Sequence, residues 1–93
     1  MKIIDATALT CPLPVLRAQK ALDALPPGYV IELLATDPMA KIDIPHFCQQ
    51  AEHVLLSQET RKSDGQGQTN LEIFCFKIQR GNRARPSDNE ISP

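Results

Sequence analysis

Residues 10–35, TCPLPVLRAQKALDALPPGYVIELLA, place a helix, a break and a strand one after another. In the first part, apolar side chains recur at intervals of three and four residues, which is the period of one helix face. They are Val15, Ala18, Leu22 and Leu25. The prolines at positions 26 and 27 cannot continue a helix, and Gly28 allows the chain to turn away. We therefore expect an amphipathic helix from Pro12 to about Leu25.

The second part, residues 29–35 (YVIELLA), is rich in β-prone residues and almost continuously apolar, with only Glu32 interrupting the run. A strand that is covered on much of both faces has this composition. We expect it to lie at the centre of a sheet. A shorter β-prone run, KIID at residues 2–5, predicts a first strand that comes before the helix.

A second helix is expected after the loop at Asp37-Pro38, with Asp43 as its cap and Pro45 early enough to be tolerated. It should end near Leu56. Its inward-facing stripe is predicted to be Phe47, Ala51 and Val54, with Leu55 alongside.

The remaining chain predicts a hairpin, with strands at residues 57–62 and 70–80 and a turn at 63–68. The order strand, helix, strand, helix, strand, strand is that of a βαβαββ two-layer α/β sandwich. In this fold a four-stranded mixed sheet is covered on one face by two helices. Residues 1–81 should form one domain, and the polar residues 82–93 (NRARPSDNEISP) a disordered tail.

Composition narrows the possible functions. The 93 residues include 10 Lys and Arg and 11 Asp and Glu, which gives a net charge of −1. The chain therefore lacks the excess of positive charge that direct binding of a nucleic acid would need. No apolar run has the length of a signal peptide or a membrane span, which predicts a cytoplasmic protein without membrane contact. Three cysteines form neither an even set nor a close pair, which is typical of a reducing compartment.

Cys11 is the candidate reactive residue. If the helix begins at Pro12, Cys11 occupies the N-cap, where the positive end of the helix dipole would stabilise a thiolate. Pro14 removes one backbone donor, so the N–H groups of Leu13 and Val15 remain nearby. This interpretation predicts a rigid, presented sulfur with a lowered pKa. The alternative is a small buried side chain at a helix start, since unpaired cysteines are often buried.

The stretch DATALTCPLPVLRAQKAL resembles the Asp-x-x-Gly-x-x-Cys-Pro-x-Pro opening of the TusA/SirA family of small sulfur-carrier proteins. The segment TDPMAKIDIPHFC, residues 36–48, is similar to that family's Asp-Pro, Asp-Ile-Pro and aromatic-Cys segment, and KIQRG resembles its closing strand. The resemblance spans residues 2–81. One residue departs from it, because Ala8 stands where the family has glycine. Alanine resists a positive φ, so the loop before the helix is expected to have a different shape.

The resemblance implies that Cys11 takes sulfane sulfur as a persulfide and that the chain acts as a stoichiometric sulfurtransferase. The implied donor is a cysteine desulfurase or a rhodanese. The implied acceptor is another protein, such as a DsrE-like sulfur relay subunit, in tRNA thiolation or another sulfur pathway. We expect a monomer that needs no cofactor. A regulatory or scaffold module without sulfur chemistry, or a redox sensor, remains open.

Other residues are weaker candidates. Cys48 is expected to pack in the core, Cys75 to face the opposite side of the sheet from its neighbours, and His46 and His53 to be solvated rather than to bind a metal. Four charged residues are possible partner contacts, although local capping or ordinary solvation is the favoured explanation for them. They are Arg17, Lys20, Asp37 and Lys41.

Overall fold

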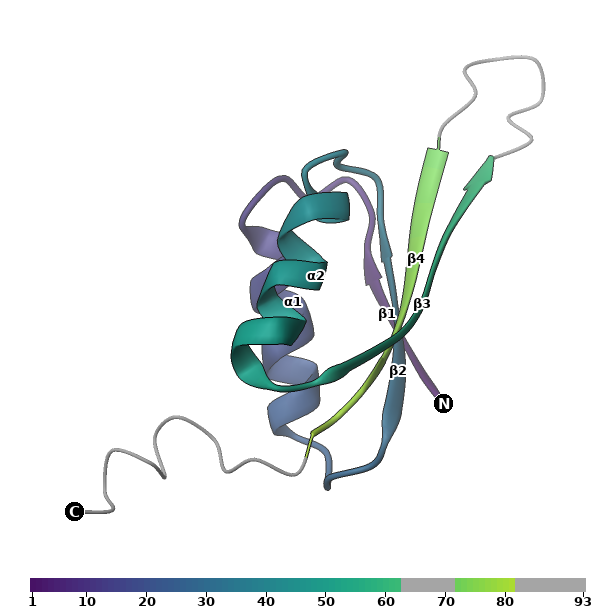
Figure 1. The fold of residues 1–93 in the computed structure, drawn as a ribbon. Helices are drawn as coiled ribbons and strands as arrows, with labels where there is room; N and C mark the ends of the chain where they lie inside the picture. The colour runs from purple at the N-terminus through teal and green to yellow at the C-terminus, as the bar shows by residue number, and fades with distance from the viewer. Residues whose placement is uncertain (63–71, 82–93) are drawn as a thin grey trace.

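The computed structural model describes residues 1–62 and 72–81, in which six elements follow one another (Figure 1). They are β1 (Lys2–Ala6), α1 (Leu13–Asp23), β2 (Val30–Ala35), α2 (Ala40–Ala51), β3 (Val54–Lys62) and β4 (Glu72–Gln79). In this part of the chain the strands form one four-stranded sheet in the order β1-β2-β4-β3. β1 is parallel to β2, and β4 is antiparallel to both its neighbours.

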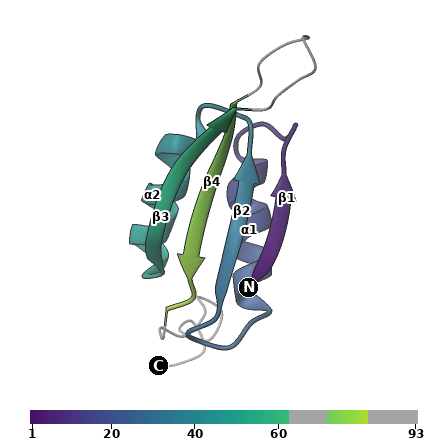
Figure 2. The same cartoon turned by 90° about the vertical axis from the view of Figure 1, so that its right-hand side faces the viewer.

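Both described helices lie against the same face of the sheet, and the other face is open (Figures 1 and 2). The predicted two-layer α/β sandwich is therefore confirmed. The core lies between the layers, where inward residues of the two central strands pair across the sheet. Leu33 is opposite Phe76, and Ile31 is opposite Ile78. All four side chains are fully buried, as are Ala18 and Leu22 of α1 and Ile44 of α2.

The predicted course of α2 was wrong at both ends. Met39 is its N-cap, and Asp43 lies in the first turn rather than at the cap. The helix ends at Ala51 because Glu52 takes a left-handed conformation with φ 61°. Val54 and Leu55 therefore begin β3 instead of extending the helix. The fully buried side chains of α2 are Ala40, Ile44 and Cys48. Of the predicted inward residues, Phe47 and Leu55 do pack against the core, whereas Val54 is 49% exposed, so the predicted stripe was correct only in part.

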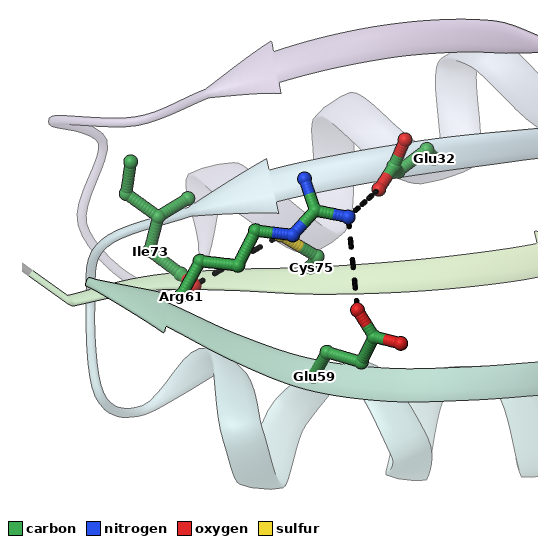
Figure 3. Close-up of polar contacts among 5 residues, drawn as sticks. All are labelled: Glu32, Glu59, Arg61, Ile73 and Cys75. Atoms are coloured by element: carbon green, nitrogen blue, oxygen red, sulfur yellow. Dashed lines mark hydrogen bonds and ion pairs between the residues drawn. The ribbon is translucent and has the colours of Figure 1, made fainter. Parts of the chain in front are cut away.

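Among the described residues, two ion pairs lie on the helix-free face of the sheet (Figure 3). Arg61 of β3 lies 3.3 Å from Glu32 of β2 and 3.6 Å from Glu59, so it reaches across β4. Cys75 lies on this face, opposite in direction to its neighbours in the core, and is 2% exposed. Its sulfur contacts the carbonyl oxygen of Ile73 at 3.9 Å. The predicted orientation of Cys75 is confirmed.

Arg80 lies at the end of the sheet that is farther from the β1–α1 loop. Its side chain is buried, and its Nε donates to the carbonyl oxygen of Leu22 at 2.8 Å. Beside it, the Gly81 N–H donates to Nδ1 of His53 at 3.0 Å. Burial, with a smaller effect from Arg80, lowers the pKa of His53. His53 is therefore half-buried rather than solvated, whereas His46 is exposed as predicted.

Neither α1 nor α2, the helices of the described residues, is long and apolar enough to cross a bilayer. The predicted turn at 63–68 and the predicted tail at 82–93 lie outside the described residues.

Candidate functional site

The candidate site is formed by the loops that follow two neighbouring parallel strands. β1 and β2 run side by side in the same direction, so their carboxyl ends meet at one edge of the sheet (Figure 2). The loop after β1 carries Cys11 and leads into α1, and the loop after β2 carries Asp37 and leads into α2. The fold thereby brings together residues that are 26 to 32 positions apart in the sequence.

The β1–α1 loop is held by its own polar groups. Asp5 Oδ1 accepts hydrogen bonds from the N–H of Thr7 at 2.9 Å and from its hydroxyl at 2.6 Å. These bonds lower the pKa of Asp5. Next along the chain, Ala8 has a φ of 67°, and its N–H donates to the Thr36 hydroxyl at 2.8 Å. The alanine thus adopts the left-handed conformation that glycine favours, contrary to the expectation that it would resist a positive φ.

Cys11 is exposed at the end of this loop and is bonded to two carboxylates. Its backbone N–H donates to Asp37 Oδ2 at 2.7 Å, and its Sγ donates to Asp43 Oδ2 at 2.8 Å. Asp37 also accepts the Met39 N–H at Oδ1, at 3.1 Å. One carboxylate therefore fixes the backbone of Cys11, and the other contacts its sulfur.

Cys11 is not the N-cap of α1. The cap is Pro12, with φ −99°, and the helix begins at Leu13, whose N–H donates to the carbonyl oxygen of Thr10 at 2.8 Å instead of serving the sulfur. The Cys11-Pro12 peptide is cis. Pro14 is buried, and Val15 packs against the core, so both hold the junction between loop and helix.

The predicted lowering of the Cys11 pKa was also wrong. The pKa is raised, first because Sγ–H donates to Asp43, then by partial desolvation, and further by the negative charges of Asp43 and Asp37. A carboxylate that accepts the thiol proton favours the neutral thiol, and a nearby negative charge disfavours the thiolate. At neutral pH the free protein therefore presents a protonated sulfur.

An open groove of about 370 Å³ runs from Cys11 between the two helices. Its lining includes Val15 and Gln19 of α1 and Asp43, His46 and Phe47 of α2. Large apolar side chains are exposed on the first turns of both helices and just before α2. They are Leu13, Leu16, Met39 and Ile42, of which Ile42 is 64% exposed. Exposed apolar side chains that lie together are typical of a contact surface for another protein.

The charged residues considered as partner contacts have specific places in the structure. Arg17 Nη1 approaches the carbonyl oxygen of Asp5 at 3.5 Å, and Lys41 Nζ lies 5.0 Å from the centre of the Phe74 ring. Lys20 lines a shallow hollow with Leu13 and Leu16. Asp37 has both carboxylate oxygens engaged in holding the loops.

The other two cysteines are packing residues. Cys48 is 2% exposed in the core, as predicted, and burial raises its pKa to about 11. Cys75 lies on the opposite face of the sheet from Cys48. Across residues 1–62 and 72–81, no group of three or more His, Cys, Asp or Glu side chains is arranged to hold a metal ion.

Sequence reasoning missed Asp43 as a partner of the sulfur, because an aspartate at a helix start has a sufficient local explanation. The parallel pairing of β1 and β2 would have indicated it. Loops that follow neighbouring parallel strands meet at one sheet edge, which is where ligand and catalytic groups gather in open α/β sheets.

The fold and the site define a class: small two-layer α/β proteins that present one exposed cysteine at the start of the first helix. The family described as Sulfurtransferase TusA matches residues 2–73, and the chain belongs to this family. A relative from Neisseria meningitidis serogroup A is 48% identical over 76 residues, which are 82% of this chain and 90% of that protein. Sulfur carrier protein TusA of Pseudomonas fluorescens is 43% identical over 56 residues, 60% of this chain and 68% of its own.

A solved structure agrees with this assignment. The SirA-like protein of Desulfitobacterium hafniense has the same fold, with a TM-score of 0.64 and 26% sequence identity. The match covers 87% of this chain and 99% of that one.

Proposed function

We propose that this protein is a sulfur carrier that holds sulfane sulfur as a persulfide on Cys11. The observation that carries the proposal is the position of this sulfur: exposed, at the mouth of a groove, on a loop fixed by Asp37. The other two cysteines are buried, so among the three thiols only Cys11 is accessible to a second protein. Membership of the TusA family, and the name of the Pseudomonas fluorescens relative, support the same chemistry.

The carrier acts stoichiometrically rather than as a catalyst with its own small substrate. The groove beside Cys11 is open rather than enclosed, which suits a protruding loop of a donor or acceptor better than a small molecule. Cys11 receives one sulfur atom, leaves the donor and gives the atom to an acceptor. Pro12, Leu13, Pro14 and Val15 support this cysteine by fixing where α1 begins.

The surface around Cys11 is the proposed contact area for both partners. The exposed Leu13, Leu16, Met39 and Ile42 supply apolar contact. Arg17, Lys20, Asp37 and Lys41 add charge at its margin. The proposed donor is a cysteine desulfurase or a rhodanese, and the proposed acceptor a DsrE-like sulfur relay subunit, in the cytoplasm. tRNA thiolation is one pathway that such a relay would serve, with the carrier itself a monomer.

Intact-protein mass spectrometry tests this function. The purified protein is incubated with a cysteine desulfurase, pyridoxal phosphate and cysteine, and in a second reaction with a rhodanese and thiosulfate. We expect one added sulfur atom that a reductant removes. The Cys11→Ser variant should fold normally and gain no sulfur.

Cys48→Ser serves as the matched control, because it removes a thiol of the same chain that is buried. It should load like the wild type as long as it remains folded. Sulfur that still appears on the Cys11→Ser variant, or a wild type that no donor loads, would contradict the proposal. The chain would then be better explained as a binding module of the same fold.

A further inference from the structure

The carboxylate of Asp43 contacts the sulfur of Cys11, the proposed carrier cysteine. The contact links an α2 side chain to a residue 32 positions earlier, with 2.8 Å between Sγ and Oδ2. At this distance the thiol donates a hydrogen bond to an ionised acceptor, and such charge-assisted bonds are stronger than neutral ones. Asp43 is half-buried between the helices, so its carboxylate is held beside the sulfur rather than free in solvent.

The charges around Cys11 all act in one direction. Asp37 on the β2–α2 loop holds the backbone of Cys11, and both carboxylates disfavour a thiolate. Two cations on these helices have other contacts: Arg17 of α1 approaches the Asp5 carbonyl oxygen, and Lys41 of α2 lies over the Phe74 ring. His46 lines the same groove and is exposed.

We propose that Asp43 keeps Cys11 as a protonated thiol in the free protein, and that a sulfur donor able to load Cys11 brings a lysine or arginine side chain against the Asp43 carboxylate. Asp43 is thus a positioning residue that selects the donor. The identity of the donor rests on the function proposed above, whereas the effect of Asp43 on the thiol does not.

The transfer step balances without an oxidant or reductant. Cys11 Sγ attacks the outer sulfur of the donor's R–S–SH group, a new S–S bond forms, and the donor's own S–S bond breaks. The electron pair leaves on the donor's inner sulfur, which takes up one proton as the Cys11 thiol loses one. The products are Cys11–S–SH and R–SH. A cation paired with Asp43 removes the charge that opposes loss of the thiol proton.

The groove fits a partner of this kind. It opens beside Cys11 and is lined by Asp43, with room of about 370 Å³ for a side chain to enter between the helices. A guanidinium or ammonium group that entered there would find a carboxylate already aligned with the sulfur. A carboxylate-bearing donor would instead meet like charge, which opposes docking.

The first test is the pH dependence of Cys11 alkylation by iodoacetamide, a neutral probe that needs no partner. Asp43→Asn keeps the size of the side chain and an oxygen acceptor but removes the charge. Its rate profile should move to lower pH than that of the wild type. At pH 7 its thiolate fraction should rise about tenfold for each unit by which the thiol pKa falls, and its rate about threefold to fourfold, because a thiolate of lower pKa is a weaker nucleophile. Asp23→Asn, the same change at the other end of α1, should leave the profile unmoved.

An unmoved Asp43→Asn profile, in a variant whose urea unfolding midpoint matches the wild type, overturns the proposal. If that variant does not fold, the alkylation profile of the wild type tests the effect of Asp43 by itself. Its alkylation profile should lie at higher pH than that of free glutathione, and a profile at or below that of glutathione overturns the effect of Asp43.

The second test compares the rates at which two donors load sulfur onto the wild type and onto Asp43→Asn. One donor is the desulfurase or rhodanese that loads the wild type. The other is glutathione persulfide, a small donor of net negative charge. Asp43→Asn should load faster from glutathione persulfide and lose its preference for the protein donor. A preference that is unchanged or increased overturns donor selection by Asp43. If no donor loads the wild type, the carrier function fails, and the alkylation result still decides the effect of Asp43 on the thiol.

Discussion

Replacing Ala8 by glycine should stabilise this protein, although the substitution removes a methyl group and adds no contact. Ala8 is exposed and has a φ of 67°. A residue with a side chain loses about 1–2 kcal/mol in this left-handed conformation, because Cβ approaches the following carbonyl oxygen. Glycine avoids that cost but gives the unfolded chain more freedom, which removes about 0.4–1 kcal/mol. The balance is a gain centred on about 0.8 kcal/mol, or about 3–6 °C in Tm for a domain of this size.

Urea unfolding of the Ala8→Gly variant measures this gain as a higher midpoint at an unchanged slope. Ala24→Gly is the matched control, because Ala24 is also exposed but has an ordinary φ of −84° at the end of α1. That variant should lose about 0.4–1 kcal/mol, since it has only the unfolded-state cost. Opposite signs for the two variants support the argument. If Ala8→Gly is destabilised like Ala24→Gly, residue 8 is not left-handed and the description of the loop before Cys11 is wrong.

Two further predictions concern the core and the far end of the sheet. A Cβ added at Gly81 would collide with the backbone carbonyl of Glu52, so Gly81→Ala should lower the free energy of unfolding by about 1–3 kcal/mol, and an unchanged urea midpoint would refute this close approach. Burial raises the pKa of Cys48 from 9.0 to about 11, so the unfolded chain ionises this thiol before the folded one does. The resulting stability is complete below pH 9 and is lost as the pH rises toward 11. Cys48→Ala should therefore show a smaller loss over this range, and equal losses would mean that the Cys48 thiol is not protected.

The sequence correctly predicted those elements whose residue pattern is compatible with only one type of secondary structure. The apolar repeat of α1 ends at two prolines, and the β2 run is rich in β-prone residues, so the place of α1 and the central position of β2 in the sheet were predicted correctly, although no helix covers the second face of β2. The end of α2 was missed because Val54 continues the helical spacing of Phe47 and Ala51. The chain stops the helix with a left-handed glutamate, Glu52, where a glycine would have been the recognisable stop.

The site was predicted only in part, because the prediction again relied on local sequence patterns. Cys11 was identified from its local sequence and from a family resemblance, but its electrostatics were inferred from the helix that follows it. In the structure α1 begins one residue later than expected, and the sulfur's partner comes from α2. A contact over 32 positions depends on which strands are neighbours, and a local pattern does not contain that information.

The direction of the pKa shift matters for both halves of a sulfur relay. A thiol with a raised pKa is a poor nucleophile at neutral pH, because the thiolate is the reacting form. The same sulfur is also a poorer leaving group when an acceptor attacks the outer sulfur of Cys11–S–SH, since thiols of lower pKa leave faster. We therefore expect Asp43 to slow loading and unloading together in the free protein. A cation that neutralised Asp43 in a complex would speed both, so we expect sulfur to move within the complex with a partner rather than on the free protein.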